Sequence, residues 1–177
     1  MKPSVIVEIF PVVDEDGNEI SRAPRSVCHD GKSMLLHPVV HLHLFNKKGE
    51  LFLQKRAMIK DLLPGKWDTS VGGHISPGEK PEEALKRETE EELGIRHFTY
   101  EFIKKYIWES SRERELVYSF IGTSDETPVI DPVELDDGRF WTLEEIRSSL
   151  GKGFFTPNFK KEFDDLTAPL LKQTAPI

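Results

Sequence analysis

The sequence has little cysteine, no long apolar run and no excess of basic residues. Cys28 is the single cysteine of the 177-residue chain, which excludes an internal disulfide and suits a reducing cytoplasm. The early apolar stretch VIVEIF is far too short to span a membrane, and an acid interrupts it. We therefore expect a cytoplasmic protein with no membrane partner.

The formal net charge of −7 disfavours non-specific binding to a nucleic acid. A small phosphorylated ligand remains compatible with this charge if a metal ion or a local basic cluster meets its phosphates. The chain length suits one well-packed domain, and no linker or repeat interrupts the sequence. We expect a single domain over residues 1–177, with residues 1–30 as an N-terminal strand hairpin extension.

Hydrophobic alternation and turn signals outline an α+β sandwich, with strands around one central helix. The predicted strands cover residues 5–13, a return strand to about residue 22, the hairpin 37–57, and residues 68–74, 98–108, 115–122 and 139–142. The predicted helices cover residues 81–93, residues 142–150 behind a capping box, and a last helix from Thr156–Pro157. His41 and His43 alternate along one strand, and we expect both to be half-exposed.

The stretch GGHISPGEKPEEALKRETEEELGI places many acids close together on the central helix. Like charges at neighbouring helical positions repel, so a bound cation would stabilise this helix. Glu88, Glu91 and Glu92 converge at the edge of its buried face, and three carboxylates at this spacing suit Mg²⁺ or Mn²⁺. The alternative is an ordinary solvated acidic face.

Eight residues of this stretch match the Nudix box, G-x5-E-x7-R-E-U-x-E-E-x-G-U, in which U is a bulky apolar residue. They are Gly73, Glu79, Arg87, Glu88, Glu91, Glu92, Gly94 and Ile95. Thr89 departs at the first U position, on the packing side of the helix, and leaves every acid in place. Residues 72–95 therefore resemble the loop and helix of a Nudix box.

The resemblance implies a Nudix-type α/β/α sandwich with a mixed sheet and a Mg²⁺- or Mn²⁺-dependent hydrolase. Its substrate would be a small molecule, a nucleoside diphosphate linked to another group or a similar diphosphate. Glu88, Glu91 and Glu92 would hold the metal with the Gly73 carbonyl, and Glu79 would pair with Arg87. Glu91 is our candidate for the general base; because the family varies in where its base lies, Glu88 stays in the catalytic set.

The flanking sequence is similar to the isopentenyl-diphosphate isomerase branch of this superfamily. LPGKWDTSVGGH and ERELVYSF carry most of that likeness. Divalent-metal ligands of the isomerase match His37, His74, Glu113 and Glu115, and its remaining histidine has only an approximate counterpart, His29, one residue out of step. Its diphosphate-binding residues match Arg56 and Lys60. The alternatives are ordinary structural histidines and solvated basic side chains.

Two departures favour hydrolysis over isomerisation. The catalytic cysteine of the isomerase falls at Gly72, which has no side chain to carry a proton, and the isomerase has an arginine where this chain has Glu88. The remaining alternatives are isomerisation of an isoprenoid diphosphate and a non-catalytic nucleotide-sensing module. The N-terminal strand could pair with a second copy at its edge in a homodimer. The identity of the substrate does not follow from the sequence.

Overall fold

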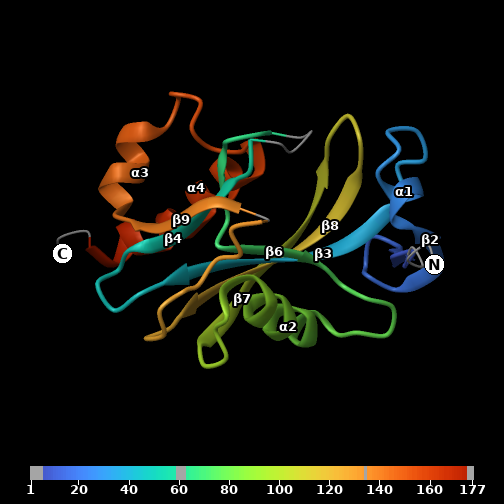
Figure 1. Ribbon diagram of the computed structural model, residues 1–177, viewed down its shortest axis with the longest axis horizontal. Helices are drawn as coiled ribbons and strands as arrows, with labels where there is room; N and C mark the ends of the chain where they lie inside the picture. Colours follow the sequence, from blue (N-terminus) through green and yellow to red (C-terminus); the bar gives the residue numbers. More distant parts are fainter. Residues whose placement is uncertain (1–5, 59–62, 134, 175–177) are drawn as a thin grey trace. The chain divides into compact units, whose positions relative to one another are not determined.

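The computed structural model describes residues 6–58, 63–133 and 135–174. These residues form two compact units (Figure 1). Unit 1 comprises residues 6–41, 72–88 and 102–120, and unit 2 comprises residues 42–58, 63–71, 89–101, 121–133 and 135–174. Strand β3 and helix α2 each contribute residues to both units.

Unit 1 contains an N-terminal hairpin of β1 (Ile9–Val13) and β2 (Glu19–Pro24), followed by the short helix α1 (Arg25–Cys28). Figure 1 shows α1 beside this hairpin. The hairpin is antiparallel and forms a two-stranded sheet of its own. Its strand begins at Ile9, so the predicted start at residue 5 was too early; Val5 lies outside the described residues. Helix α1 was not predicted, because four residues are too few for a periodic pattern.

The larger sheet has the hydrogen-bonded order β5-β4-β3-β8-β7, with β6 paired to β3 and β9 paired to β4. Its strands are β3 (Leu36–Phe45), β4 (Leu51–Arg56), β5 (Trp67–Asp68), β6 (Val71–His74), β7 (Thr99–Glu109), β8 (Arg114–Thr123) and β9 (Leu135–Trp141). The predicted hairpin is confirmed, as is the α+β class with a mixed sheet. The single strand predicted over residues 68–74 was wrong, because the chain forms two strands there, β5 and β6, which pair with different neighbours. The expectation of two half-exposed histidines was wrong: all of β3 is buried, His41 and His43 included.

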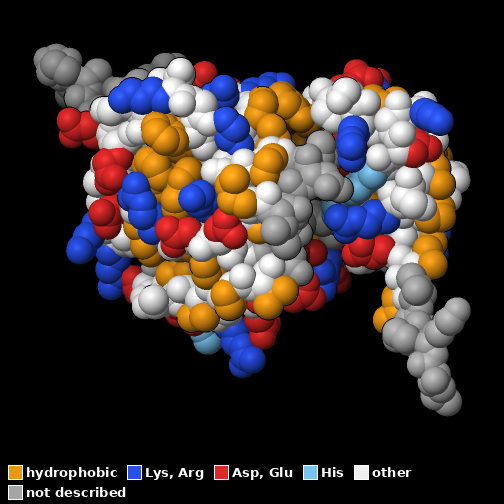
Figure 2. Space-filling model, turned by 45° about the horizontal axis from the view of Figure 1, so that its top comes forward, with side chains coloured by type: hydrophobic (Ala, Val, Ile, Leu, Met, Phe, Trp, Pro, Cys, Tyr) orange, Lys and Arg blue, Asp and Glu red, His pale blue; other side chains and the backbone are white. Residues whose placement is uncertain are grey.

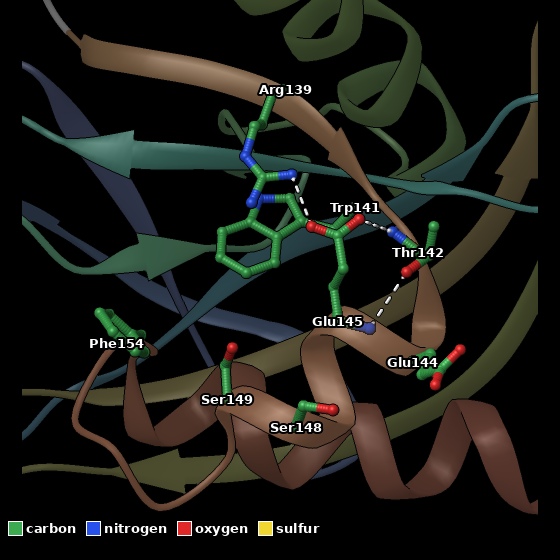
Figure 3. A pocket seen from close by; sticks show the side chains of 8 residues that line it. All are labelled: Arg139, Trp141, Thr142, Glu144, Glu145, Ser148, Ser149 and Phe154. Atoms are coloured by element: carbon green, nitrogen blue, oxygen red, sulfur yellow. Dashed lines mark hydrogen bonds and ion pairs between the residues drawn. The ribbon is translucent and has the colours of Figure 1, made fainter.

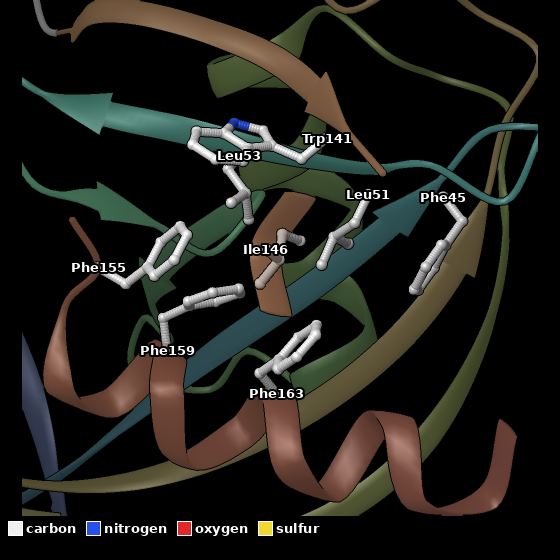
Figure 4. Close-up of a cluster of buried hydrophobic side chains, with 8 residues drawn as sticks. All are labelled: Phe45, Leu51, Leu53, Trp141, Ile146, Phe155, Phe159 and Phe163. Carbon is white, nitrogen blue, oxygen red and sulfur yellow. The ribbon is translucent and has the colours of Figure 1, made fainter. Parts of the chain in front are cut away.

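The core of unit 2 is an aromatic and aliphatic cluster under β4 and β9 (Figure 4). Phe155 precedes α4 (Pro157–Thr174), and Phe159 and Phe163 follow on the same face of that helix. They pack against residues of β3, β4, β9 and α3 (Leu143–Ser149), namely Phe45, Leu51, Leu53, Trp141 and Ile146. The predicted packing role of the three phenylalanines is therefore confirmed, and so is the capping box of α3, whose Thr142 and Glu145 exchange hydrogen bonds.

Helix α2 (Pro81–Leu93) carries the acidic stretch and has one buried face. Ala84, Leu85, Thr89 and Leu93 are each fully buried, which confirms that Thr89 lies on the packing side. Gly94 ends the helix with a positive φ of 68°, and its N–H donates to the Glu90 carbonyl oxygen at 2.9 Å. The buried face fixes the helix, so the remaining faces present the acids.

Acidic and basic side chains are interspersed on the face drawn in Figure 2. Within the residues that the structure describes, no helix combines the length and the apolar character needed to cross a membrane.

Candidate metal-binding sites

Arg87 anchors the loop before α2 to the helix. Its Nε donates to Glu79 Oε2 at 2.8 Å, and its Nη2 donates to Glu79 Oε1 at 2.9 Å. The hydrogen bonds from Arg87 hold the pKa of the Glu79 carboxyl below its usual value despite partial burial. The structure thus brings together the two residues expected to pair.

Glu88 lies between this pair and the backbone of Gly73. Arg87 Nη1 donates to Glu88 Oε1 at 2.7 Å, which orients the carboxylate. A Cβ added to Gly73 would lie 2.2 Å from Glu88 Cδ, a distance that real atoms do not reach. Glycine leaves this space, so the Glu88 carboxylate packs directly on the Gly73 backbone.

Glu91 and Glu92 lie one turn further along α2. Glu92 is partly buried and Glu91 is exposed. Carboxylates at positions i, i+3 and i+4 project along one side of a helix. Carboxylate oxygens are the hard ligands that Mg²⁺ and Mn²⁺ prefer.

A second candidate site lies in unit 1, at the ends of its strands. One ligand atom from each of four residues lies within 4.8 Å of the other three: His29, His37, His74 and Glu113. His29 Nε2 is 2.7 Å from Glu113 Oε2, and His37 Nε2 is 3.4 Å from the same oxygen. We call these four residues the histidine centre.

The chemistry of the histidine centre fits a divalent cation. The Nε2 atoms of its three histidines and Glu113 Oε2 are buried, and His74 Nε2 has no hydrogen-bond partner among the described residues. Buried polar atoms normally find such a partner, so their convergence points to a ligand. His37 Nδ1 lies 3.0 Å from the Leu35 carbonyl oxygen, and the tautomer that donates this bond leaves Nε2 available to a metal.

The protonation states in the histidine centre follow from burial and neighbouring charges. Burial, together with the charges of His37, Arg25 and His29, lowers the pKa of His74 to about 3, so its imidazole is neutral near pH 7. Burial opposes ionisation of Glu113, but His29 and His37 outweigh it and hold the Glu113 pKa well below its usual value. A neutral imidazole beside an ionised carboxylate is the state that binds a cation.

The Glu115 carboxyl interacts electrostatically with residues of the histidine centre. Burial raises its pKa to about 7, with a further contribution from the charge of Glu113, while His41, His37 and His29 oppose the shift. A nearby divalent cation would reverse this balance, because it favours the ionised carboxylate. Glu115, which the resemblance expects to be a metal ligand, is not one of the four residues of the histidine centre.

Of the four residues of the histidine centre, His29 had the weakest support from the sequence. The resemblance gave it only an approximate match, yet the structure brings it into contact distance of Glu113. His29 is the C-cap of helix α1. Among the expected substrate-binding residues, Arg56 Nη1 lies 3.8 Å from Asp68 Oδ2, and Lys60 lies outside the described residues.

A separate hollow of about 480 Å³ lies in unit 2 between β9 and α3 (Figure 3). The Arg139 guanidinium packs 3.7 Å from the centroid of the Trp141 ring, and its Nη1 pairs with Glu145 at 3.2 Å. None of the expected site residues lines it. Its cation is already paired, so we assign it no ligand.

Comparison with known proteins places the chain among Nudix proteins. The NUDIX domain family model matches residues 35–163. Isopentenyl-diphosphate Delta-isomerase 1 of Photorhabdus laumondii is 32% identical over 168 residues, covering 90% of this chain and 95% of that protein. An uncharacterised Nudix hydrolase of Listeria monocytogenes is 35% identical over 134 residues, covering 70% of this chain and 74% of that protein.

Solved structures of low sequence identity share the fold. A crystal structure of a Deinococcus radiodurans protein superposes with a TM-score of 0.74 at 23% identity, covering 89% of this chain and 98% of that one. The NUDIX domain of Shewanella oneidensis NrtR, solved with ADP ribose, has a TM-score of 0.63 at 16% identity, with coverages of 75% and 87%. The Nudix-type fold expected from the sequence is therefore confirmed.

Proposed function

Because this chain belongs to the Nudix family and is a Nudix-type pyrophosphohydrolase, we propose that it cleaves a diphosphate linkage in a nucleoside-diphosphate derivative or a related diphosphate, with Mg²⁺ or Mn²⁺ as cofactor. The observation that carries the proposal is the complete box. Arg87 clamps Glu79 and orients Glu88 against Gly73, with Glu91 and Glu92 one turn away on α2.

The acids of the box would have two roles, binding metal ions and accepting a proton. Glu88, Glu91, Glu92 and the Gly73 carbonyl would hold divalent cations, which neutralise a diphosphate and activate water when bound. Glu91 is exposed, so its carboxylate can accept the proton of an attacking water; Glu88 is the alternative base. Glu79 and Arg87 would serve as structural supports.

The histidine centre would hold a further ion. Three imidazoles with Glu113, and Glu115 nearby, suit Mn²⁺ better than Mg²⁺, because nitrogen ligands favour the softer cation. Arg56 and Lys60 would meet the phosphates of the substrate. The NrtR domain complexed with ADP ribose supports a nucleoside-diphosphate derivative as the substrate class.

Isomerisation of an isoprenoid diphosphate is the second candidate, because relatives named isopentenyl-diphosphate isomerase cover most of this chain. Gly72, which falls at the position of the isomerase cysteine, offers no acid–base group. A third reading is a nucleotide-sensing module that binds its ligand without turnover. Incubation with isopentenyl diphosphate separates the first two: we expect no allylic isomer, and its formation would favour the isomerase.

The hydrolase is tested with a panel of diphosphates in the presence of Mg²⁺ or Mn²⁺. Nucleotide sugars, dinucleoside diphosphates, nucleoside triphosphates and isoprenoid diphosphates are assayed for release of phosphate or a monophosphate. We expect metal-dependent cleavage that Glu91→Gln and Glu92→Gln abolish. Glu90→Gln is the matched control, since Glu90 pairs with the exposed Arg96. Metal-dependent binding without cleavage across the panel would favour the sensing module.

Three wider expectations remain part of the proposal. The family match spans residues of both units, which supports a single Nudix domain over the chain. The apolar side chains of Ile6, Val7 and Ile9 are exposed, which supports a homodimer through the N-terminal strand; light scattering of the purified protein would test it. The buried free thiol of Cys28 is consistent with a cytoplasmic location, and we expect small-molecule rather than nucleic-acid partners.

A further inference from the structure

The three histidines of the histidine centre share one aromatic neighbour, Phe10 of β1. Its ring centroid lies 4.1 Å from that of His74, with the two planes only 8° apart. It lies 5.6 Å from the His37 ring at 15° and 5.8 Å from the His29 ring at 51°. One phenyl ring from the N-terminal hairpin thus contacts every imidazole of the centre.

Phe10 is itself rigidly placed. It is only 2% exposed and packs in a cluster with Val12, Ala23 and Cys28. Its backbone is paired with Ala23 across the β1–β2 hairpin. A buried ring restricts rotation of the imidazoles stacked on it, so less side-chain freedom is lost when they bind an ion.

The stacking also has an electrostatic consequence. The face of a phenyl ring carries negative charge density, which attracts a positively charged neighbour. An imidazole that donates its lone pair to a divalent cation becomes more positive than the free neutral ring. Parallel stacking of Phe10 on His74 and His37 should therefore stabilise the metal-bound form more than the metal-free form.

We propose that Phe10 is a positioning residue of the histidine centre: its ring fixes the planes of His74 and His37 and raises the affinity of the centre for a divalent cation. The inference rests on the proposed function, because it takes the histidine centre to be a metal site. It assigns the N-terminal hairpin, which lies outside the Nudix box, a direct part in metal binding.

Co²⁺ binding to the full-length protein tests this role. Visible absorption reports the ligand field of Co²⁺, and the band that His74→Ala abolishes is assigned to the histidine centre. We expect Phe10→Leu to weaken this binding about tenfold or more and to shift the band, by analogy with other residues that orient metal ligands. Phe120→Leu is the matched control: Phe120 is a buried ring of unit 1 that contacts the Phe102 ring edge-on instead, and its replacement should leave the dissociation constant within about twofold.

The outcomes separate the two proposals. Unchanged Co²⁺ affinity and spectrum in folded Phe10→Leu would overturn the role of Phe10 but not the proposal that the histidine centre binds a metal ion. A wild-type protein without a His74-dependent band would overturn both. If circular dichroism shows that Phe10→Leu does not fold, pentafluorophenylalanine at position 10 replaces it. That side chain keeps the ring and reverses its charge distribution, so it should weaken binding, and unchanged affinity would again refute the role of Phe10.

Discussion

Arg87 Nη2 donates a hydrogen bond to the backbone carbonyl of His74 at 3.0 Å. The same guanidinium binds Glu79 of the preceding loop and Glu88 of α2, so one side chain connects both acids to the end of β6. His74 supplies a ligand atom to the histidine centre, and Glu88 belongs to the box. The Arg87 side chain therefore contacts residues of both candidate metal sites.

Arg87→Lys should weaken both sites. Lysine keeps the positive charge but cannot form the planar fork that holds Glu79 while reaching Glu88 and the His74 carbonyl. We expect Mg²⁺-dependent turnover to fall at least about tenfold and Co²⁺ affinity of the histidine centre to fall severalfold. Turnover assays and Co²⁺ titration measure the two effects. Lys86→Arg, one residue away on the exposed side of α2, is the control; loss of turnover alone would show that the sites are independent.

Glu79→Gln should make stability less dependent on pH in acid. The folded-state pKa of Glu79 is lowered from 4.5, so its ionised form stabilises the protein above that value, and this contribution is lost as the pH falls through the lowered pKa. We expect wild type to exceed Glu79→Gln by about 1 kcal/mol at neutral pH, with the difference vanishing in strong acid. Urea unfolding across the pH range measures it, with the exposed Glu101→Gln as control. A difference that persists in strong acid would contradict the assignment.

The box could be predicted from the sequence because its contacts are local. Glu79 and Arg87 are eight residues apart, and the helix and the preceding turn bring them together with little help from the rest of the fold. The burial of Thr89 likewise follows from helical periodicity. The aromatic core beside α4 was predictable for the same reason, since Phe159 and Phe163 recur on one helical face and Phe155 lies just before the helix.

The histidine centre was predicted only through resemblance, and incompletely. Its residues come from the C-cap of α1, from β3 and β6, and from the position just before β8, so their convergence depends on pairings between distant segments. No local pattern could show that α1 brings His29 to Glu113, or that Phe10 stacks on His74. The burial of His41 and His43 was missed because alternation predicts one exposed face, whereas β3 is covered on both.

Phe159→Ala should destabilise the protein strongly. Phe159 is fully buried and contacts the rings of Phe155 and Phe163 at centroid distances of 5.3 and 5.8 Å. Removing the ring leaves a cavity in the core of unit 2, and we expect a loss of roughly 3–5 kcal/mol in the free energy of unfolding. Phe154→Ala is the control, since Phe154 is 47% exposed and should change stability by less than about 0.5 kcal/mol. Denaturant unfolding compares the two variants. Equal losses in the free energy of unfolding would contradict the assignment of Phe159 to the core.

Gly73→Ala should disable the box by displacing Glu88. The added Cβ would lie 2.2 Å from Glu88 Cδ and 2.4 Å from Glu88 Cγ, so the carboxylate must leave its position and its bond to Arg87. We expect metal-dependent turnover to fall about 10- to 100-fold or more, because a ligand and its orienting contact are lost together.

A double-mutant cycle isolates this clash from any effect of alanine on the backbone. In the Glu88→Ala background the obstructing carboxylate is absent, so adding Gly73→Ala should cost little further stability. We expect a coupling energy of about 1–3 kcal/mol between the two positions, measured by urea unfolding. Additive losses would mean that Gly73 is required for the conformation of its own backbone. Coupling would instead show that glycine is needed at position 73 because the Glu88 carboxylate must rest against it.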